Sequence, residues 1–599
     1  MKRVLVTMLI TTLLMAGLTG FGLWKANDIS RSLTDADELY ASEEKDLAGS
    51  KSLVSAAERK KAHELFISGN KKNVETFGIT DTSEIYDTDR SAGVKNSISA
   101  LLRKGSYTLS EPFFAYDPFG TNSLSMYIYF ETSDECYIRY TVSVDDKTIP
   151  DFTRTMRNSS GSVSETIHEG TIMGLVPGME NYIELTSYDA RNKKLNSAVF
   201  SVTMPVESFG NPVKLTTSDG DDLSLTNGLF TLFPSDRNFI LIYDNSGVIR
   251  GEMPLLSSSG VNMQQIGDEL YFVCDKDKLA AIDNIGMITK VITADGYTEL
   301  GEFDYDEAGH FYMIADAQSG GAGGSTKKAV KRTANAGNSG PVHDRIISLD
   351  PEKGTVSEIF DPGTMPGAAG RILKAAGDPV FSSIQADGKL NSLLAASAGT
   401  SSIIQIDDLG TDYTNISMIL GDAGSWNGNK ALKKKIFARK SSKKGKAAKE
   451  EKKRAKILGL GTSNAGQAFE AISAPASIVY DDGNSCMSKI ANTDNMQRTE
   501  KGTRNISLYA LGHDKGRTYF VRYKADTKKK VYYEESKVKL PESSAAGNVQ
   551  AVEDSLISSG GKLGDFTESS SEGKLLRSYK TGFPVDRVYK YDYKALWFG

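Results

Sequence analysis

Short apolar strands that end in polar turns recur along most of this 599-residue chain. The stretch from Ser383 to Trp426 shows the pattern most clearly. It predicts strands at 391–395, 402–406 and 416–420, with a turn at 407–410 between the second and the third. Successive hairpins of this kind are typical of a repeating β architecture. We therefore predict an all-β protein.

Two patterns alternate beyond residue 211. One is an apolar strand that ends in Asp before a Gly turn, as in ILIYDNSG (240–247) and IIQIDDLG (403–410). The other is a turn that leads into a very apolar strand, as in GDELYFV (267–273) and NSLLAAS (391–397). Interleaved hairpins fit a β-propeller with about four strands in each of about six blades, because a closed ring also removes exposed strand edges. We place this six-bladed propeller at residues 212–599.

The region before the propeller divides into two parts. Strands with period-two alternation, such as MYIYFETS (126–133) and NYIELTSYD (181–189), predict a β-sandwich over residues 109–205. Residues 26–108 are polar and rich in Ala, Glu and Lys. We predict a helical stalk or linker there, with a partly disordered spacer as the alternative.

The N-terminus predicts export. Lys2 and Arg3 precede an uncharged run from Val4 to Trp24, which at about 1.5 Å per residue spans roughly 30 Å of hydrocarbon. Positive residues on the short side place the rest of the chain outside the cytoplasm. Because no small-x-small cleavage site is clear, we favour an uncleaved signal anchor over residues 1–25; with cleavage, the chain would be secreted. The prediction is a single-pass protein of the cell membrane with extracytoplasmic domains.

Composition and charge exclude little. The chain is 39% hydrophobic with a net charge of -5, so its overall charge does not predict a nucleic-acid partner. The three cysteines lie far apart and form no CxxC pair, so we predict buried free thiols and neither a metal site nor a disulfide framework. No cofactor is predicted.

Two low-complexity insertions interrupt the propeller, at 317–342 and 427–457. The second includes Lys430 to Lys456, with fourteen basic residues against two acidic ones. This run indicates either a patch for an anionic polymer or lipid, or a solvated insertion, and we favour the insertion. Its one aromatic residue, Phe437, gives base stacking no support.

Several motifs resemble those of bacterial arylsulfotransferases. In the sandwich they are SEPFFAYDPFGTNSLSMYIYFET (110–132) and TIHEGTIMGLVPGMENYIELT (166–186). In the propeller they are GEFDYDEAGHFYMIAD (301–316), SIQADGKLNSLLAASAGTSSIIQID (383–407), ISMILGDAGSW (416–426) and GQAFEAISAPASIVYDDGNS (466–485). The resemblance runs in consistent order from Glu111 to Phe598.

This resemblance implies a β-sandwich followed by a six-bladed propeller, and transfer of a sulfuryl group from an aryl sulfate to a phenol without metal or nucleotide. It implies a histidine nucleophile that is transiently sulfated, helped by further histidines and an arginine around the central channel. Imidazole is a neutral nucleophile near pH 7, and fixed cations stabilise the charge that grows on the oxygens. The family's dimers suggest self-association of this chain.

The positions that match the family's catalytic motifs hold other residues here, namely Gly301, Val380, Ala398 and Ala468. We place none of the five histidines as a nucleophile: His63, His168, His310, His343 and His513. Small residues at the motif positions predict a wider, less polar channel.

We therefore predict an exported, membrane-anchored arylsulfotransferase-like propeller that has lost sulfotransfer and acts as a binding or structural protein, a pseudoenzyme. The alternative is an active aryl-sulfate sulfotransferase with a relocated nucleophile, so whether the chain is an enzyme stays open. In a third interpretation, the propeller is a subunit of a cell-surface assembly. An aryl sulfate or a phenol is the small molecule that the resemblance implies.

Overall fold

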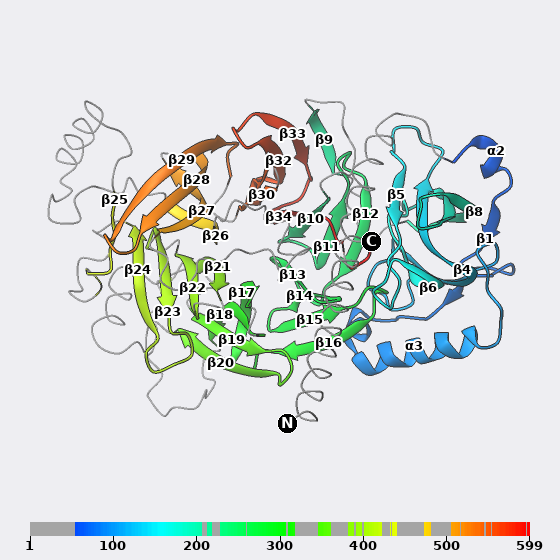
Figure 1. The fold of residues 1–599 in the computed structure, drawn as a ribbon, viewed down its shortest axis with the longest axis horizontal. Helices are drawn as coiled ribbons and strands as arrows, with labels where there is room; N and C mark the ends of the chain where they lie inside the picture. The colour runs from blue at the N-terminus through cyan, green and yellow to red at the C-terminus, as the bar shows by residue number, and fades with distance from the viewer. Residues whose placement is uncertain are drawn as a thin grey trace, which may run out of the picture. The chain divides into compact units, whose positions relative to one another are not determined.

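The structure is a computed structural model. It describes residues 54–206, 213–218, 228–258, 260–306, 309–317, 345–360, 381–387, 391–397, 400–421, 432, 434–439, 473–480, 505–514, 517–543, 547–552, 554–594 and 596–599. The predicted all-β fold, a β-sandwich followed by a six-bladed β-propeller, is confirmed (Figure 1). The anchor predicted over residues 1–25 lies outside the described residues.

One long strand, β4 (Met126–Ser143), organises the sandwich. It pairs with β3 and β6 along its first half and with β5 and β7 along its second half, and a register shift between Glu131 and Cys136 separates the two. A bulge of this kind bends a strand, so one strand can serve both sets of partners. The partners are β3 (Phe113–Tyr116), β5 (Phe152–Thr155), β6 (Ser164–Ile172) and β7 (Glu180–Tyr188), and β8 (Lys194–Thr203) pairs with β7.

Residues 54–108 differ from the stalk that we predicted. Two short strands, β1 (His63–Leu65) and β2 (Glu75–Thr76), extend the sandwich sheet. The helix α3 (Thr88–Leu102) buries Val94 and Ile98 in one apolar cluster with sandwich residues. These two residues lie four positions apart on one helix face, and that burial holds the segment against the sandwich. The remaining elements are α2 (Ala56–Arg59) and the 3-10 turn η1 (Thr82–Tyr86).

The propeller consists of six sheets in ring order, all antiparallel except that β25 joins blade V in parallel. Blade I is β10 (Leu229–Pro234), β11 (Phe239–Tyr243), β12 (Ile249–Pro254) and β34 (Val585–Tyr591); blade II is β13 (Met263–Ile266), β14 (Glu269–Asp275), β15 (Lys278–Ile282) and β16 (Ile288–Thr293); blade III is β17 (Tyr297–Tyr305), β18 (Phe311–Ala317), β19 (Arg345–Asp350) and β20 (Thr355–Phe360). Blade IV is β21 (Phe381–Asp387), β22 (Ser392–Ser397), β23 (Ser402–Asp407) and β24 (Asn415–Gly421); blade V is β26 (Ser473–Tyr480), β27 (Asn505–Asp514), β28 (Arg517–Asp526) and β29 (Val531–Leu540) with β25 (Ala438–Arg439); blade VI is β30 (Val549–Val552), β31 (Ser555–Ser559), β32 (Asp565–Ser570) and β33 (Leu575–Lys580), with the turn η4 (Gly561–Leu563).

Strands from both ends of the propeller close the ring. The C-terminal β34 pairs with β10 as the innermost strand of blade I, and β9 (Lys214–Ser218) pairs with β33 as the outermost strand of blade VI. Each closing strand covers an edge that would otherwise expose unpaired backbone groups. Blades I and VI are therefore held together by both termini of the domain.

The Lys-rich insertion is described at 432 and at 434–439. Leu432, Ile436 and Phe437 are buried there, so this part of the insertion is packed and not solvated as we favoured. Ile436 forms an isolated β-bridge with Ile419 of blade IV, and β25 pairs with β29 of blade V. The rest of that insertion, and the first insertion beyond residue 317, lie outside the described residues.

A buried arginine joins the sandwich to the propeller. Arg250 of β12 forms an ion pair with Asp244, with Nε 2.8 Å from Oδ2. Its Nη1 and Nη2 donate to the carbonyls of Gly174 and Pro150 in the sandwich, at 3.1 and 2.7 Å. Because a guanidinium carries five N–H donors, one side chain can serve all three acceptors.

Candidate functional site in the propeller channel

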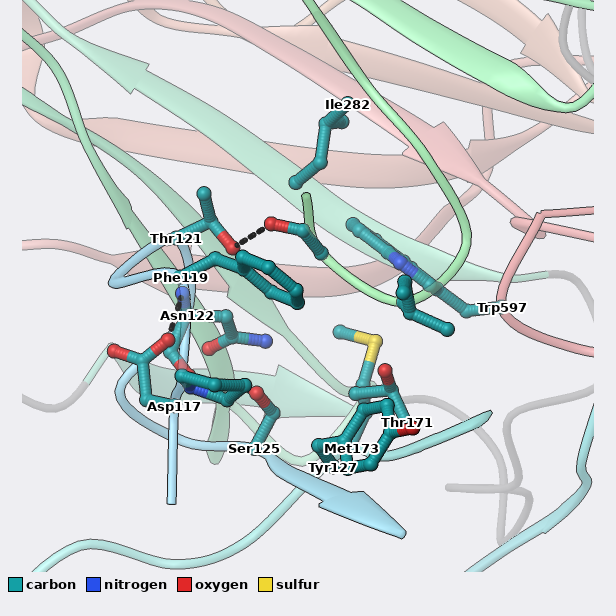
Figure 2. A pocket seen from close by; sticks show the side chains of 13 residues that line it. Asp117, Phe119, Thr121, Asn122, Ser125, Tyr127, Thr171, Met173, Ile282 and Trp597 are labelled. Carbon is teal, nitrogen blue, oxygen red and sulfur yellow. Dashed lines mark hydrogen bonds between the residues drawn. The ribbon is translucent and has the colours of Figure 1, made fainter. Parts of the chain in front are cut away.

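A small cavity lies between the sandwich and the propeller (Figure 2). Its volume is about 10 Å³, roughly that of one water molecule. Burial and the nearby Glu252 raise the pKa of the Asp117 carboxyl in its wall to about 6. The cavity is too small for an aryl sulfate, so the propeller channel is the better candidate site. The wall residues of the cavity are Asp117, Pro118, Phe119, Thr121, Asn122, Ser125, Tyr127, Thr171, Met173, Ile282, Ile285, Gly286 and Trp597.

The inner strands of the propeller have no neighbouring strand on the channel side, so their backbone groups need other partners. Two blades provide these partners through amide side chains. Asn548 and Val588 exchange two hydrogen bonds: Nδ2 donates to the carbonyl oxygen and Oδ1 accepts from the N–H, both at 2.8 Å. Asn262 of blade II does the same with Phe303 of blade III, at 2.8 and 3.3 Å. An amide suits this role because it can donate and accept at once.

Blade III uses carboxylates where blades II and VI use amides. Glu302 accepts from Ser383 Oγ at 2.5 Å and from the Ile384 N–H at 3.2 Å. Asp304 accepts from the Ala386 N–H at 2.8 Å. A carboxylate can only accept, and its charge in a channel with restricted water requires compensation.

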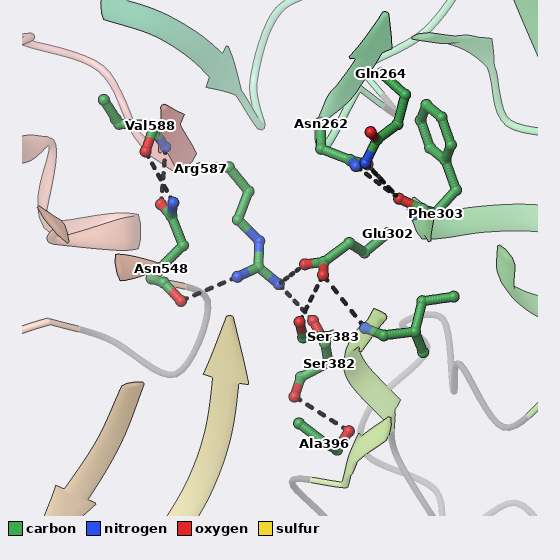
Figure 3. Close-up of polar contacts among 12 residues, drawn as sticks. Asn262, Gln264, Glu302, Phe303, Ser382, Ser383, Ala396, Asn548, Arg587 and Val588 are labelled. Atoms are coloured by element: carbon green, nitrogen blue, oxygen red, sulfur yellow. Dashed lines mark hydrogen bonds and ion pairs between the residues drawn. The ribbon is translucent and has the colours of Figure 1, made fainter. Parts of the chain in front are cut away.

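Arg587 supplies a positive charge beside Glu302 (Figure 3). Its Nη2 lies 3.9 Å from Glu302 Oε2 and donates to the Ser382 carbonyl at 2.7 Å. Its Nη1 donates to the Gly547 carbonyl at 3.1 Å. Arg587 belongs to blade I and Ser382 to blade IV, which lie three blades apart in a ring of six and hence opposite each other. We call the contacts of Arg587 with Glu302, Ser382 and Gly547 the Arg587 bridge.

Irregular backbone places two of the three groups that Arg587 contacts, Glu302 and the Ser382 carbonyl. The pairing of β17 with β18 shifts register between Leu300 and Phe303, and the pairing of β21 with β22 shifts between Phe381 and Ser383. Such bulges redirect side chains and backbone groups out of the regular pleat. Here they bring Glu302 and the Ser382 carbonyl to the guanidinium.

The Arg587 bridge changes the expectation for the channel. We predicted a wider and less polar channel without a guanidinium. Instead, a guanidinium crosses it, from a C-terminal strand that the sequence did not single out. The side chains of Arg587 and Glu302 are each 10% exposed, so both are largely removed from solvent. The signal that could have found Arg587 is its place in the alternating run VDRVYKY, once that run is recognised as an inner strand.

One of the four motif positions is described. Gly301 is buried in β17, directly before Glu302. Val380 precedes the described residues of β21 and is two positions from Ser382. Val380, Ala398 and Ala468 lie outside the described residues. Two groups of the Arg587 bridge therefore lie within two positions in the chain of Gly301 and Val380, where the resemblance implies imidazoles.

The described histidines belong to other elements than β17, β21 and β34, which carry Glu302, Ser382 and Arg587. His310 closes the turn after β17, where its ring faces Asp306 at 3.5 Å and is 45% exposed. His168 is buried in the sandwich, stacked on Phe130, and burial lowers the pKa of its imidazole to about 4. His63 is exposed on β1, and His513 belongs to β27. His343 lies outside the described residues.

A second charged group lies buried between blades VI and I. Lys590 Nζ is 3.3 Å from Glu568 Oε1, and Arg577 Nη1 is 2.6 Å from Glu568 Oε2. Lys590 also lies over the Phe230 ring, at 4.5 Å from its centroid. The side chains of Lys590 and Glu568 are almost fully buried. They pair with each other, so neither charge is accessible to a ligand in the channel.

Within the described ranges, no group of three or more His, Cys, Asp or Glu side chains could hold a metal ion. In the same part of the chain, no helix has the length and apolar character needed to cross a membrane. Cys136 and Cys274 are buried free thiols, as predicted.

The comparisons with known proteins agree with the motifs. The family model described as "Arylsulfotransferase Ig-like domain" matches residues 113–205, and the model described as "Arylsulfotransferase (ASST)" matches residues 213–593. No curated protein matches the chain. Among solved structures, a functionally unknown protein from Desulfotomaculum acetoxidans is 8% identical, with 67% of this chain and 92% of that one covered and a TM-score of 0.29. A protein from Lactobacillus plantarum is 9% identical, with 68% and 97% covered and a TM-score of 0.28. Scores this low carry no argument about function.

Proposed function

The chain belongs to the arylsulfotransferase family, and from this premise we propose that it is an exported, membrane-anchored member that has lost sulfotransfer and acts as a binding or structural protein. The observation that supports the proposal is the Arg587 bridge. It joins opposite blades beside Gly301, where the family's motif has an imidazole. A guanidinium and a carboxylate that pair with each other are not poised to stabilise a developing sulfuryl charge.

The energetics of the bridge support the same conclusion. To serve a sulfate group, Arg587 would have to release Glu302 or the carbonyls of Ser382 and Gly547. Leaving one member of a buried charge pair alone costs about 3–5 kcal/mol. A catalytic site gains rate only from groups that are free to bind the transition state better than the ground state. In this protein, the charged contacts of Arg587 stabilise the folded state instead.

A sulfotransfer assay tests the loss of activity. Purified full-length protein is incubated with an aryl sulfate donor and a phenol acceptor, beside an arylsulfotransferase that has the histidine and arginine set as a positive control. We expect no donor-dependent sulfation of the phenol. Donor-dependent sulfation of the phenol would refute the proposal, whether or not it survives substitution of His310 and His513.

The rival function is an active enzyme with a relocated nucleophile. It requires a covalent sulfated intermediate on some side chain of the protein. Intact-mass measurement after incubation with the donor alone decides between the two, because a sulfuryl adduct adds a defined mass that peptide mapping can locate. We expect the unmodified mass; an adduct on one residue would establish the enzyme.

Membrane anchoring is proposed from the apolar run Val4 to Trp24. Alkaline carbonate extraction of membranes from expressing cells tests it, since carbonate removes peripheral proteins and leaves spanning helices in place. We expect the chain in the membrane pellet. Full release into the supernatant would contradict an uncleaved anchor.

A further inference from the structure

The fold brings together two lysine-rich segments that lie about ninety residues apart in the sequence. The β25–β29 pairing places the segment 434–439 beside the turn 528–530 of blade V. The Ala438 N–H donates to the Lys530 carbonyl at 2.9 Å, and Lys530 Nζ donates to the Lys434 carbonyl at 3.0 Å. We call Lys434, Lys435, Lys528, Lys529 and Lys530 the blade V lysine patch.

Buried apolar side chains fix the patch in place. Ile436 and Phe437 are buried, and the backbone on either side of Ile436 is hydrogen-bonded to blade IV. The Ile419 N–H donates to the Lys435 carbonyl at 3.0 Å, and the Phe437 N–H donates to the Ile419 carbonyl at 2.9 Å. The lysines are therefore held on packed backbone, and binding to them requires little ordering of the chain.

Most of the charge in the patch is not neutralised. Lys434, Lys528, Lys529 and Lys530 are exposed and Lys435 is half-buried. Lys529 lies 3.5 Å from Asp526. Over the described ranges, Lys434, Lys435 and Lys528 form no ion pair. Several like charges held close together repel one another, and an anionic ligand relieves this repulsion.

We propose that the blade V lysine patch binds a linear polyphosphate, a chain of phosphate groups without bases. Lysine ammonium groups act as point charges that suit a tetrahedral phosphate, whereas planar bidentate recognition would favour arginine. The apolar side chains of segment 432–437, Leu432, Ile436 and Phe437, are all buried. This segment therefore offers no aromatic ring for stacking nucleic-acid bases and no apolar group to insert into a bilayer.

The test compares two variants of the full-length protein with equal changes in net charge. The patch variant is K528Q/K529Q/K530N, with Asn at 530 because the φ of Lys530 is +52° and Asn tolerates that conformation. The control variant is K104Q/K147Q/K193Q, in which three exposed lysines of the sandwich region are replaced. Binding of inorganic polyphosphate is measured at several salt concentrations.

We expect the patch variant to bind polyphosphate roughly tenfold more weakly. The slope of log affinity against log salt concentration should become less steep by about two to three, since each lost ion contact reduces that slope by about 0.7–0.9. The control variant keeps the wild-type affinity. K434Q, on the other segment, lowers the affinity about twofold without touching the turn. Equal affinity of patch variant and control overturns the proposal. Tighter binding to phosphatidylglycerol vesicles or to single-stranded DNA than to polyphosphate also overturns it, in favour of a membrane or a nucleic-acid partner.

Discussion

Replacing Arg587 by methionine tests whether the Arg587 bridge holds the propeller together. The substitution removes the donors to the Ser382 and Gly547 carbonyls and the cation beside Glu302. A hydrogen bond from a charged donor contributes about 1.5–3 kcal/mol, and breaking a buried ion pair by removing one partner costs about 3–5 kcal/mol. These terms overlap, so we expect R587M to lower the free energy of unfolding by about 3–5 kcal/mol.

The substitution Glu302→Gln has a smaller expected effect. Its Oε1 still accepts from Ser383 and Ile384, while the attraction across 3.9 Å to Arg587 is lost. We expect a loss of only about 1 kcal/mol, the size of one typical polar interaction, because Arg587 keeps its hydrogen bonds to the Ser382 and Gly547 carbonyls. In the double variant R587M/E302Q, the introduced thioether side chain faces a neutral amide, so no unpaired carboxylate remains. The double variant should therefore be more stable than the sum of the single losses predicts, by about 1–2 kcal/mol.

Denaturant unfolding of the wild type, both single variants and the double variant gives this coupling energy. R191M, which replaces an exposed arginine of the sandwich, is the control and should stay within about 0.5 kcal/mol of the wild type. The bridge is refuted if the single losses add within about 0.3–0.5 kcal/mol, because residues that do not interact behave additively.

Three further predictions concern buried charges. Burial raises the pKa of Asp117 to about 6, so its stabilising contribution is complete below about pH 4 and is lost as the pH rises through 6. Asp117→Asn should therefore stabilise the protein above pH 6, by about 1–2 kcal/mol given its half-buried position, in unfolding measured from pH 4 to 8; a loss at pH 8 would contradict this. Burial lowers the pKa of His168 to about 4, so its stabilising contribution is complete above about pH 6.5 and is lost as the pH falls to 4. His168→Gln should remove this pH dependence, worth about 3 kcal/mol, and an unchanged acid limb of the stability profile would refute the assignment. Lys590→Met should change the free energy of unfolding by less than about 1 kcal/mol because Arg577 still pairs with Glu568, whereas Glu568→Leu should cost about 3–5 kcal/mol; the reverse order would contradict the pairing.

Much of the fold follows from local pattern. The strands predicted at 391–395, 402–406 and 416–420 are β22, β23 and β24, to within one or two residues. Period-two alternation is a property of neighbouring residues, so the sequence carries it directly. The helix α3 falls within residues 26–108, where we predicted a helical stalk, but its packing against the sandwich was not predicted. The polar composition of that region hid the buried face that Val94 and Ile98 form.

Closure of the ring could not be predicted in the same way. The run VDRVYKY (585–591) predicts a strand. Nothing near it in the sequence indicates that it pairs with Leu229–Pro234, more than three hundred residues earlier. Register over such distances is set by tertiary packing. For the same reason, Arg587 could not be placed in the channel, although the resemblance identified the neighbouring positions Gly301 and Val380. The substitutions at the motif positions were visible in the sequence, and the residue that enters the channel was not.

The inner strands explain why polar residues in this channel need not indicate catalysis. Every inner strand of a propeller has backbone groups that no further strand can pair. In this chain, Asn262 and Asn548 satisfy such groups on the next blade, and Glu302 does so on blade IV. A carboxylate in that role brings a charge that an amide does not, and Arg587 is the cation placed against it. The same ring of positions can therefore carry either the family's chemistry or the contacts between blades. A guanidinium that already spans opposite blades favours the second use in this protein.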